Sequence, residues 1–301
     1  MNRQIATSIG ILALILWSTQ VGLLRLSTET FGAMYTVTYV YTISAIILVF
    51  SYGLPDFKKV SKKFLIISSS LFVIFELCFA FSITLSSSAE KSIEMNIIFN
   101  LWPTLIILML AIFKEEKVNA FTIFGVIVSF IGIIMTNYHP NLNFIENIAQ
   151  SPISYFLILL ASVLWAFYCI YTKKHSNGTN AVSIYFICTA ITLWVLTLST
   201  QGFHLPHVEH MMSYGFVILN AIFFAMGYLA WNIGMIKGNM PVLVTLSYFS
   251  PIASSIFSAI TLHSSLSISF WYGAITVTIG SLICWLSIRK NNKVKHVKLA
   301  T

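Results

Sequence analysis

Residues 92–113, SIEMNIIFNLWPTLIILMLAIF, form a long apolar stretch with one acidic residue and no Lys or Arg. A helix needs about 20 residues, at ~1.5 Å each, to cross ~30 Å of hydrocarbon, so this stretch can span a bilayer. Its polarity does not alternate as in a strand of a transmembrane barrel. The stretch therefore predicts a membrane-spanning helix, and its centre carries Asn100 and Pro103.

Comparable apolar runs occur along the whole chain. Of its 301 residues, 57% are hydrophobic and 9% are charged, against roughly 25% charged in an ordinary globular protein. So few charges cannot provide the surface of a water-soluble protein. We therefore expect an all-α integral membrane protein with ten transmembrane helices, at residues 4–24, 33–52, 64–86, 92–113, 118–136, 152–173, 180–200, 212–236, 240–261 and 268–288.

Positive charges fall mainly on one side of these predicted spans. If the amino terminus is cytoplasmic, only Arg25 and Lys91 lie outside, which is the bias that the positive-inside rule describes. The net charge of +8 thus indicates orientation, and its dispersal over short loops gives no support for nucleic-acid binding. We expect both termini in the cytoplasm, together with Arg3, Lys58, Lys59, Lys62, Lys63, Lys114, Lys117, Lys173, Lys174, Lys237, Arg289, Lys290, Lys293, Lys295 and Lys298.

An internal duplication is visible at a single offset of 148 residues. A repeat of five helices is odd-numbered, so its second copy must enter the membrane in the opposite orientation. Inverted repeats of this kind place a substrate site near the midplane between the halves. We expect a first repeat at 1–136, an outside loop at 137–151, a second repeat at 152–288 and a basic cytoplasmic tail at 289–301. The matched pairs are Trp17 with Trp165, Pro103 with Pro251, Gly125 with Gly273 and Gly132 with Gly280.

The sequence lacks the motifs of common enzymes, namely GxxxxGK[ST], HExxH and GxSxG. His204, His207 and His210 are spaced by three, and this pattern favours an irregular polar loop over a metal site. The cysteines form no zinc or disulfide pattern. We expect no enzymatic activity, no catalytic residue, no metal and no cofactor.

Prolines and aromatic residues inside the spans indicate a cavity. Pro103 and Pro251 should leave the carbonyls of Phe99 and Ser247 without a helical partner, which at this depth requires burial or a wet cavity. Helical spacing adds a polar stripe from Asn96 to Pro103. Packing against neighbouring helices is the alternative for each group. The candidate cavity residues are Trp17, Phe79, Asn100, Trp102, Pro103, Trp165, Tyr228, Trp231, Ser247, Tyr248 and Pro251.

Acidic residues are expected at two kinds of position, inside a span and on the outer rim. Glu76 is deep in a span and must be protonated, paired or hydrated. It could bind a substrate ammonium, carry a proton or make a structural hydrogen bond. Glu90, Lys91 and Glu94 are expected on a solvated outer rim.

Glycines seven residues apart in the fifth and tenth spans predict a close helix contact. We expect Gly125, Gly132, Gly273 and Gly280 to serve symmetric packing or homodimerisation, with no contact to substrate.

Several segments together resemble the drug/metabolite transporter superfamily, in its EamA-type branch. They are Ile15-Leu16-Trp17-Ser18, Phe99-Asn100-Leu101-Trp102-Pro103 and Ser247-Tyr248-Phe249-Ser250-Pro251. The resemblance extends along nearly the whole chain. It implies a bacterial inner-membrane exporter of aromatic amino acids, with a central cavity lined by Trp17, Trp102, Pro103 and Trp165. Phe79 and Ile83 depart from the tyrosines expected in the third span, which affects the polar side of the pocket.

We therefore expect export of Phe, Tyr and Trp by alternating access, with the lipid bilayer and a small-molecule substrate as partners. The alternatives are another substrate of the superfamily, such as a cysteine-pathway compound, a nucleoside or an aromatic cation. A lipid-carrier flippase or an intramembrane enzyme is the alternative of another class. Proton exchange and downhill facilitation are both compatible with the sequence.

The orientation predicts a labelling pattern. Single cysteines placed in the 139–147 loop should react with an impermeant maleimide added to cells with a permeable outer membrane, and cysteines at positions 60 or 115 should not. The reverse pattern would overturn the topology and the direction of transport.

Overall fold

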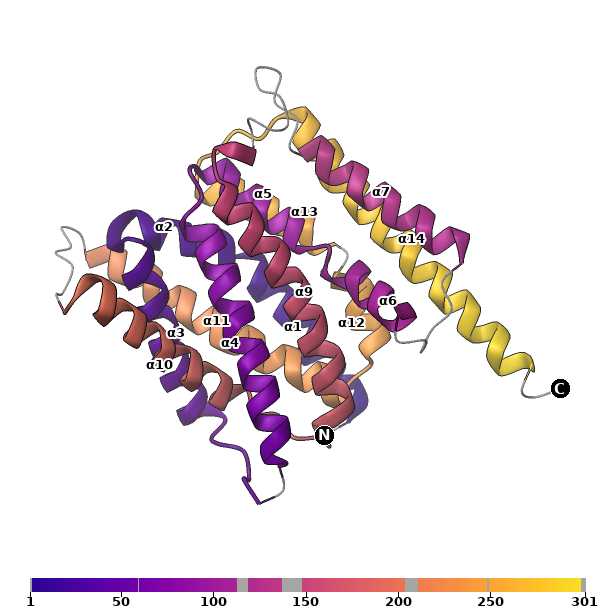
Figure 1. Cartoon of the computed structure of the whole chain (residues 1–301), viewed down its shortest axis with the longest axis horizontal. Helices are drawn as coiled ribbons and strands as arrows, with labels where there is room; N and C mark the ends of the chain where they lie inside the picture. The colour runs from indigo at the N-terminus through magenta and orange to yellow at the C-terminus, as the bar shows by residue number, and fades with distance from the viewer. Residues whose placement is uncertain are drawn as a thin grey trace.

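The structure, a computed structural model, describes residues 2–58, 60–112, 119–136, 148–203, 211–247 and 249–298. Helices account for all the regular secondary structure in these ranges (Figure 1). They are α1 (Arg3–Ser18), α2 (Gln20–Phe31), α3 (Ala33–Ser51), α4 (Lys62–Thr84), α5 (Ala89–Phe99), α6 (Trp102–Ile112), α7 (Ala120–Thr136), α9 (Pro152–His175), α10 (Val182–Gln201), α11 (Met211–Lys237), α12 (Met240–Ser247), α13 (Ser250–Thr261) and α14 (Ile268–Lys298).

These helices correspond to the ten predicted spans, which confirms the fold class. Three spans consist of two helices each, namely α1 with α2, α5 with α6, and α12 with α13. Within the described ranges, six spans are long and apolar enough to cross a membrane alone, and shorter apolar helices supply others. The first span runs on to Phe31, so Arg25 lies within α2 and donates from Nη1 to the Ser86 carbonyl at 2.8 Å. The last helix continues through most of the predicted tail to Lys298.

The main helix pairings join the first repeat to the second. Helix α1 packs on α11 and α4 packs on α9, and these two pairings are equivalent when the repeats are exchanged. The pairings α3 with α10 and α7 with α14 are each equivalent to themselves. This is the contact pattern of two inverted repeats related by a pseudo-two-fold axis.

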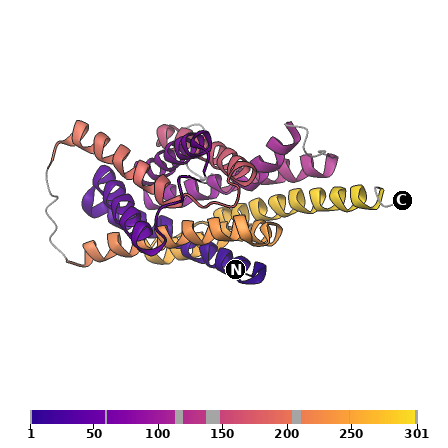
Figure 2. The same cartoon turned by 90° about the horizontal axis from the view of Figure 1, so that it is seen from below.

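Helices α7 and α14 lie side by side at one edge of the molecule, as both views show (Figures 1 and 2). The predicted glycines allow this contact. A Cβ atom on Gly125 would lie 2.7 Å from the Gly280 carbonyl, and one on Gly273 would lie 2.7 Å from the Gly132 carbonyl. The glycine faces are therefore filled within the chain, and they provide no free surface for homodimerisation.

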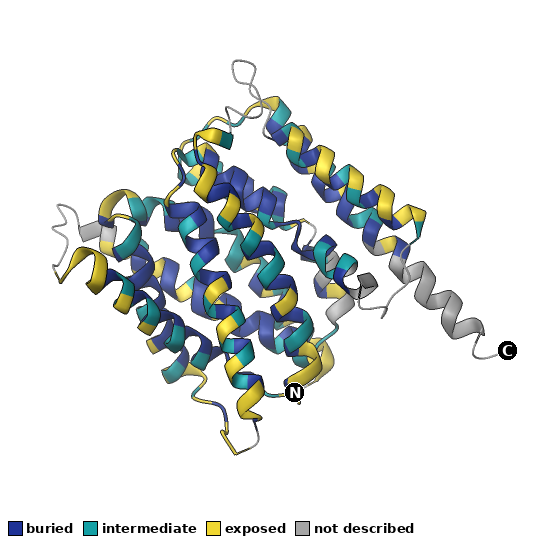
Figure 3. Cartoon of the chain, in the orientation of Figure 1, coloured by how far each residue is buried: buried dark blue, intermediate teal, exposed yellow. Residues whose placement is uncertain are grey.

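Burial divides the helices into an inner and an outer face (Figure 3). The core contains large aromatic side chains that are almost fully buried, including Phe72, Trp165, Tyr168 and Trp231. Apolar side chains such as Phe50 and Phe130 are exposed on the outside, where a bilayer would cover them.

Two charges expected on a solvated rim are buried, so that prediction was wrong for Lys91 and Glu94. Their side chains form an ion pair at 3.2 Å, and Lys91 Nζ donates to the Tyr155 hydroxyl at 3.0 Å. The Tyr155 hydroxyl in turn donates to Glu94 at 2.5 Å. Burial is tolerated because each charge has a partner. Only Glu90 remains exposed.

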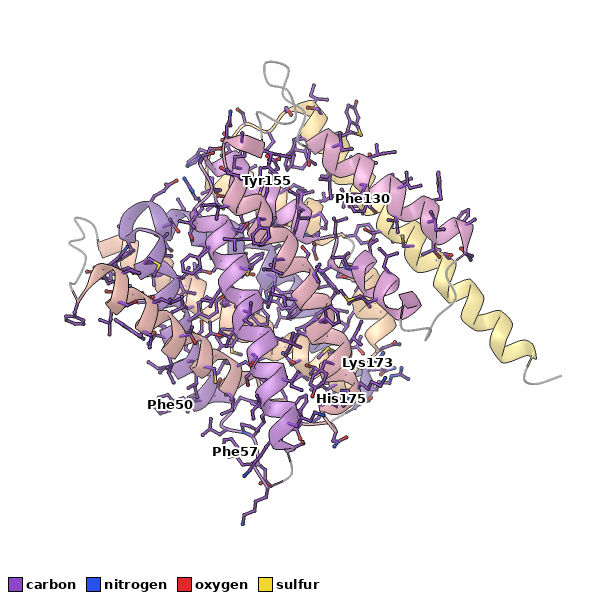
Figure 4. All side chains as sticks on the ribbon, viewed as in Figure 1. Phe50, Phe57, Phe130, Tyr155, Lys173 and His175 are labelled. Carbon is purple, nitrogen blue, oxygen red and sulfur yellow. The ribbon has the colours of Figure 1, made fainter. Side chains whose placement is uncertain are left out.

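Opposite ends of α9 mark the two sides of the bundle (Figure 4). Tyr155 lies at one end, and Lys173 and His175 lie at the other, which is also the end where Phe57 of the loop before α4 lies. The amino terminus lies at the same end as Lys173 (Figure 1). The predicted cytoplasmic groups Lys173 and Arg3 are thus at one end, and which side of the membrane that end faces stays a prediction.

Close packing of α7 on α14 generates a stability prediction. Replacing Gly125 or Gly273 by Ala should destabilise the protein by about 1–3 kcal/mol, because the added methyl group meets backbone that must move. The measurement is thermal unfolding of the purified protein in detergent, followed by intrinsic fluorescence. Gly215→Ala in α11 is the matched control, since open space surrounds Gly215. Equal melting temperatures for all three variants and the parent protein would contradict the close contact.

Candidate transport cavity

The first membrane span is interrupted at Thr19, between α1 and α2. Hydroxyl groups there compete with the backbone for helical carbonyls. Ser18 Oγ donates to the Ile15 carbonyl at 2.6 Å, and Thr19 Oγ1 donates to the Leu16 carbonyl at 2.8 Å. The adjacent Trp17 and Gln20 are therefore held on either side of a helix break.

The fourth span is interrupted between Phe99 and Trp102. Pro103 is the second residue of α6, where a helix has no partner for a backbone N–H, so the proline removes no hydrogen bond. The Phe99 carbonyl, expected to lack a partner, lies 3.4 Å from Ser162 Oγ, whose shorter hydrogen bond is to the Ile158 carbonyl at 2.8 Å. The fourth span is thus two helices separated by a break, with Pro103 near the start of the second helix.

The ninth span has the equivalent interruption. Helix α12 ends at Ser247 and α13 begins at Ser250, with Pro251 as its second residue. The matched prolines Pro103 and Pro251 therefore start helices at corresponding places in the two repeats.

All three interruptions border one cavity of about 50 Å³. In the first repeat, residues on both sides of the α1–α2 break and of the α5–α6 break line the cavity. In the second repeat, residues on both sides of the α12–α13 break do so. The lining residues are Leu14, Trp17, Ser18, Gln20, Phe79, Asn96, Phe99, Asn100, Trp102, Trp165, Tyr228, Ser247, Ser250 and Ser254.

Aromatic rings form one wall of the cavity. The ring centroids of Trp17 and Trp165, which the repeat relates, are 6.0 Å apart at an interplanar angle of 81°. Trp102 meets Trp165 edge to face at 6.2 Å. Tyr228 lies 5.0 Å from Trp17 and 5.8 Å from Trp165. Such edge-to-face contacts fix each ring by its neighbours and leave a rigid apolar surface.

Most of the predicted cavity residues are brought together here. Seven of them border the cavity: Trp17, Phe79, Asn100, Trp102, Trp165, Tyr228 and Ser247. Trp231 is fully buried behind them, 5.1 Å from Trp17 and 5.9 Å from Trp102 between ring centroids. Pro103 and Pro251 adjoin lining residues but do not border the space. Tyr248 lies outside the described residues, as do His204, His207 and His210.

Glu76 does not border the cavity. Its side chain is fully buried, and the Tyr41 hydroxyl donates to Oε2. Tyr228, which borders the cavity, faces the same carboxyl group. Glu76 is therefore separated from the cavity by a tyrosine ring.

Asn96 and Ser254 belong to polar stripes that helical spacing predicts at the cavity, whereas Leu14, Ser18, Gln20, Phe99 and Ser250 were absent from the predicted set. Asn96 and Asn100 share a helical face, and Ser254 is three residues from Pro251, so helical spacing indicates both. Leu14 and Gln20 are each three residues from Trp17. Because the helix breaks at Thr19, this spacing does not predict that Gln20 shares a face with Trp17. In the described ranges, no group of His, Cys, Asp and Glu residues could hold a metal ion.

Comparison with known proteins identifies the family. The EamA-like transporter family matches residues 4–138 and again residues 152–286. The chain is 36% identical to the aromatic amino acid exporter YddG of Salmonella typhimurium over 298 residues, covering 96% of this chain and 100% of the relative. It is also 36% identical to the exporter of the same name from Escherichia coli over 297 residues, with the same coverage.

Two further comparisons agree with this result. An uncharacterized transporter of Clostridium kluyveri is 26% identical over 230 residues, covering 73% of this chain and 70% of the relative. A solved crystal structure with 18% identity has the same fold, with a TM-score of 0.68 over 96% of this chain and 100% of that one. Two matches to the family model in one chain, together with 36% identity to two exporters over 96% of the chain, lead to one conclusion: this multi-pass membrane protein belongs to the EamA-like transporter family of the drug/metabolite transporter superfamily.

Proposed function

We propose that this protein exports the aromatic amino acids phenylalanine, tyrosine and tryptophan across the bacterial inner membrane. The observation that carries the proposal is the cavity between the repeats, which combines an indole wall with uncharged polar groups. The similarity to two aromatic amino acid exporters over 96% of the chain supports the same substrate class.

The two parts of the cavity suit the two parts of such a substrate. Trp17, Trp102 and Trp165 provide ring faces and edges on which an aromatic side chain can pack. Asn100 and Ser247 provide hydrogen-bonding groups for the amino acid head group. Phe79 borders the cavity where the family resemblance implies a tyrosine, so this side of the pocket is more apolar and favours phenylalanine over tyrosine.

Alternating access is the proposed mechanism. The cavity of about 50 Å³ lies between the two repeats, and we propose that the surrounding helices separate when a substrate enters. We propose that residues 1–136 and 152–288 rock against each other, with both termini in the cytoplasm. Glycine-mediated packing of α7 on α14 would hold the repeats together at one edge during this motion.

Glu76 is assigned a structural role in this proposal. Its carboxyl group is fully buried and hydrogen-bonded by Tyr41, which braces α4 against α3 behind the aromatic wall. A protonated carboxyl group carries no charge, so it can be buried in a low-dielectric environment without a counter-ion.

Substrate specificity can be measured by counterflow. Purified protein in liposomes loaded with unlabelled phenylalanine should accumulate labelled phenylalanine, tyrosine and tryptophan, but not labelled cysteine. Protein-free liposomes are the control. Exchange of cysteine in the absence of aromatic exchange would contradict the proposal and favour another metabolite of the superfamily.

The aromatic wall predicts the effect of removing indoles. The Trp102→Ala and Trp165→Ala changes should each weaken phenylalanine exchange roughly two- to tenfold, because an aromatic contact contributes about 0.5–1.5 kcal/mol beyond burial. Trp271→Ala is the matched control, since Trp271 packs on Phe270 and does not border the cavity. Wild-type exchange of all three aromatic amino acids by the double variant would remove these tryptophans from the site.

A further inference from the structure

Every described side chain that borders the cavity is uncharged. The buried ionisable side chains of α4 and α5 lie elsewhere: Glu76 is behind Tyr228, and Lys91 pairs with Glu94. A free amino acid nevertheless has an ammonium group and a carboxylate. If the proposed function holds, both groups must be bound by neutral dipoles.

Asn100 has a side-chain orientation fixed by its partner. Its Nδ2 atom donates to the Asn96 carbonyl at 2.7 Å. A carbonyl oxygen can only accept a hydrogen bond, so the amide nitrogen must face it and the amide oxygen must point away. No donor in the described ranges occupies that oxygen, and Asn100 borders the cavity.

Asn96 is fixed in the same way by the second repeat. Its Nδ2 atom donates to Ser254 Oγ at 2.6 Å, across the interface between α5 and α13. The Ser254 hydroxyl uses its own proton on the Pro251 carbonyl at 3.3 Å, so it acts as the acceptor. The amide oxygen of Asn96 is left without a donor from the described part of the chain.

These two amide oxygens belong to one face of α5 and its cap, since four residues separate them. Each carries a partial negative charge, and an ammonium group has three N–H donors to share between such acceptors. The complementary donor is Gln20 at the break between α1 and α2. Gln20 is 7% exposed, borders the cavity, and its Nε2 atom has no hydrogen-bond partner.

We propose that the amide oxygens of Asn96 and Asn100 bind the substrate ammonium group and that Gln20 Nε2 binds its carboxylate. This subsite rests on the proposed function and narrows it to zwitterions with an aromatic side chain. An ion with a net charge would lose its hydration in the cavity without meeting a counter-ion, which is unfavourable inside a membrane. Ligands that lack either the ammonium group or the carboxylate are therefore expected to bind more weakly than the zwitterion.

Two analogues of phenylalanine test the subsite in proteoliposomes. Phenylethylamine lacks the carboxylate, and 3-phenylpropionate lacks the ammonium group. Each should inhibit phenylalanine counterflow at least tenfold more weakly than unlabelled phenylalanine does. Phenylalanine exchange with equal inhibition by either analogue would overturn the subsite and leave the proposed function standing. Absence of phenylalanine exchange would overturn the proposed function and the subsite with it.

Charge variants assign the role to individual residues. Asn96→Asp and Asn100→Asp place a carboxylate where an amide oxygen is proposed to meet the ammonium group, so phenylethylamine should inhibit several-fold better. Inhibition by 3-phenylpropionate should not improve. Asn177→Asp is the matched control, because Asn177 is exposed and does not border the cavity, and it should retain the wild-type ranking of the three ligands. An unchanged ranking in both Asp variants would overturn the assignment.

Discussion

Inside a bilayer every backbone N–H and C=O group needs a partner within the protein, and this constraint determines where helices can break. All three interruptions in the described chain lie in the interior, and each borders the same cavity. Ser18 and Thr19 supply hydroxyl donors to the carbonyls that the first break exposes, and the Ser162 hydroxyl lies beside the Phe99 carbonyl at the second break. The breaks therefore do two things: they bring polar groups to the middle of the membrane, and they keep them away from lipid.

The inverted repeat places these breaks opposite one another. Trp17 and Trp165 meet in the cavity wall because their helices occupy equivalent positions in the two halves. Around this centre, α1 packs on α11 and α4 packs on α9, so each half is covered mainly by the other half.

Much of the fold could be predicted because its signals are local. Apolar runs long enough to span a bilayer identify the helices, and the offset of 148 residues relates Pro103 to Pro251. The same reasoning grouped Trp17, Trp102 and Trp165. That reasoning failed for Lys91 and Glu94, because their burial depends on Tyr155 from a distant helix. It also missed Gln20, because the helix break at Thr19 changes which residues share a face. Sequence spacing cannot anticipate partners that only tertiary contact supplies.

The central claim is that the two repeats separate around the cavity during transport. Ser87, before α5, belongs to the first repeat, and Ser151, before α9, is the last residue of the linker to the second repeat. Their hydroxyl oxygens are 3.0 Å apart. A disulfide between Ser87→Cys and Ser151→Cys should hold this end closed. We expect oxidation of the double variant to stop phenylalanine counterflow and reduction to restore it, while each single variant is unaffected by oxidation. Undiminished exchange by the fully cross-linked protein would contradict the proposed motion.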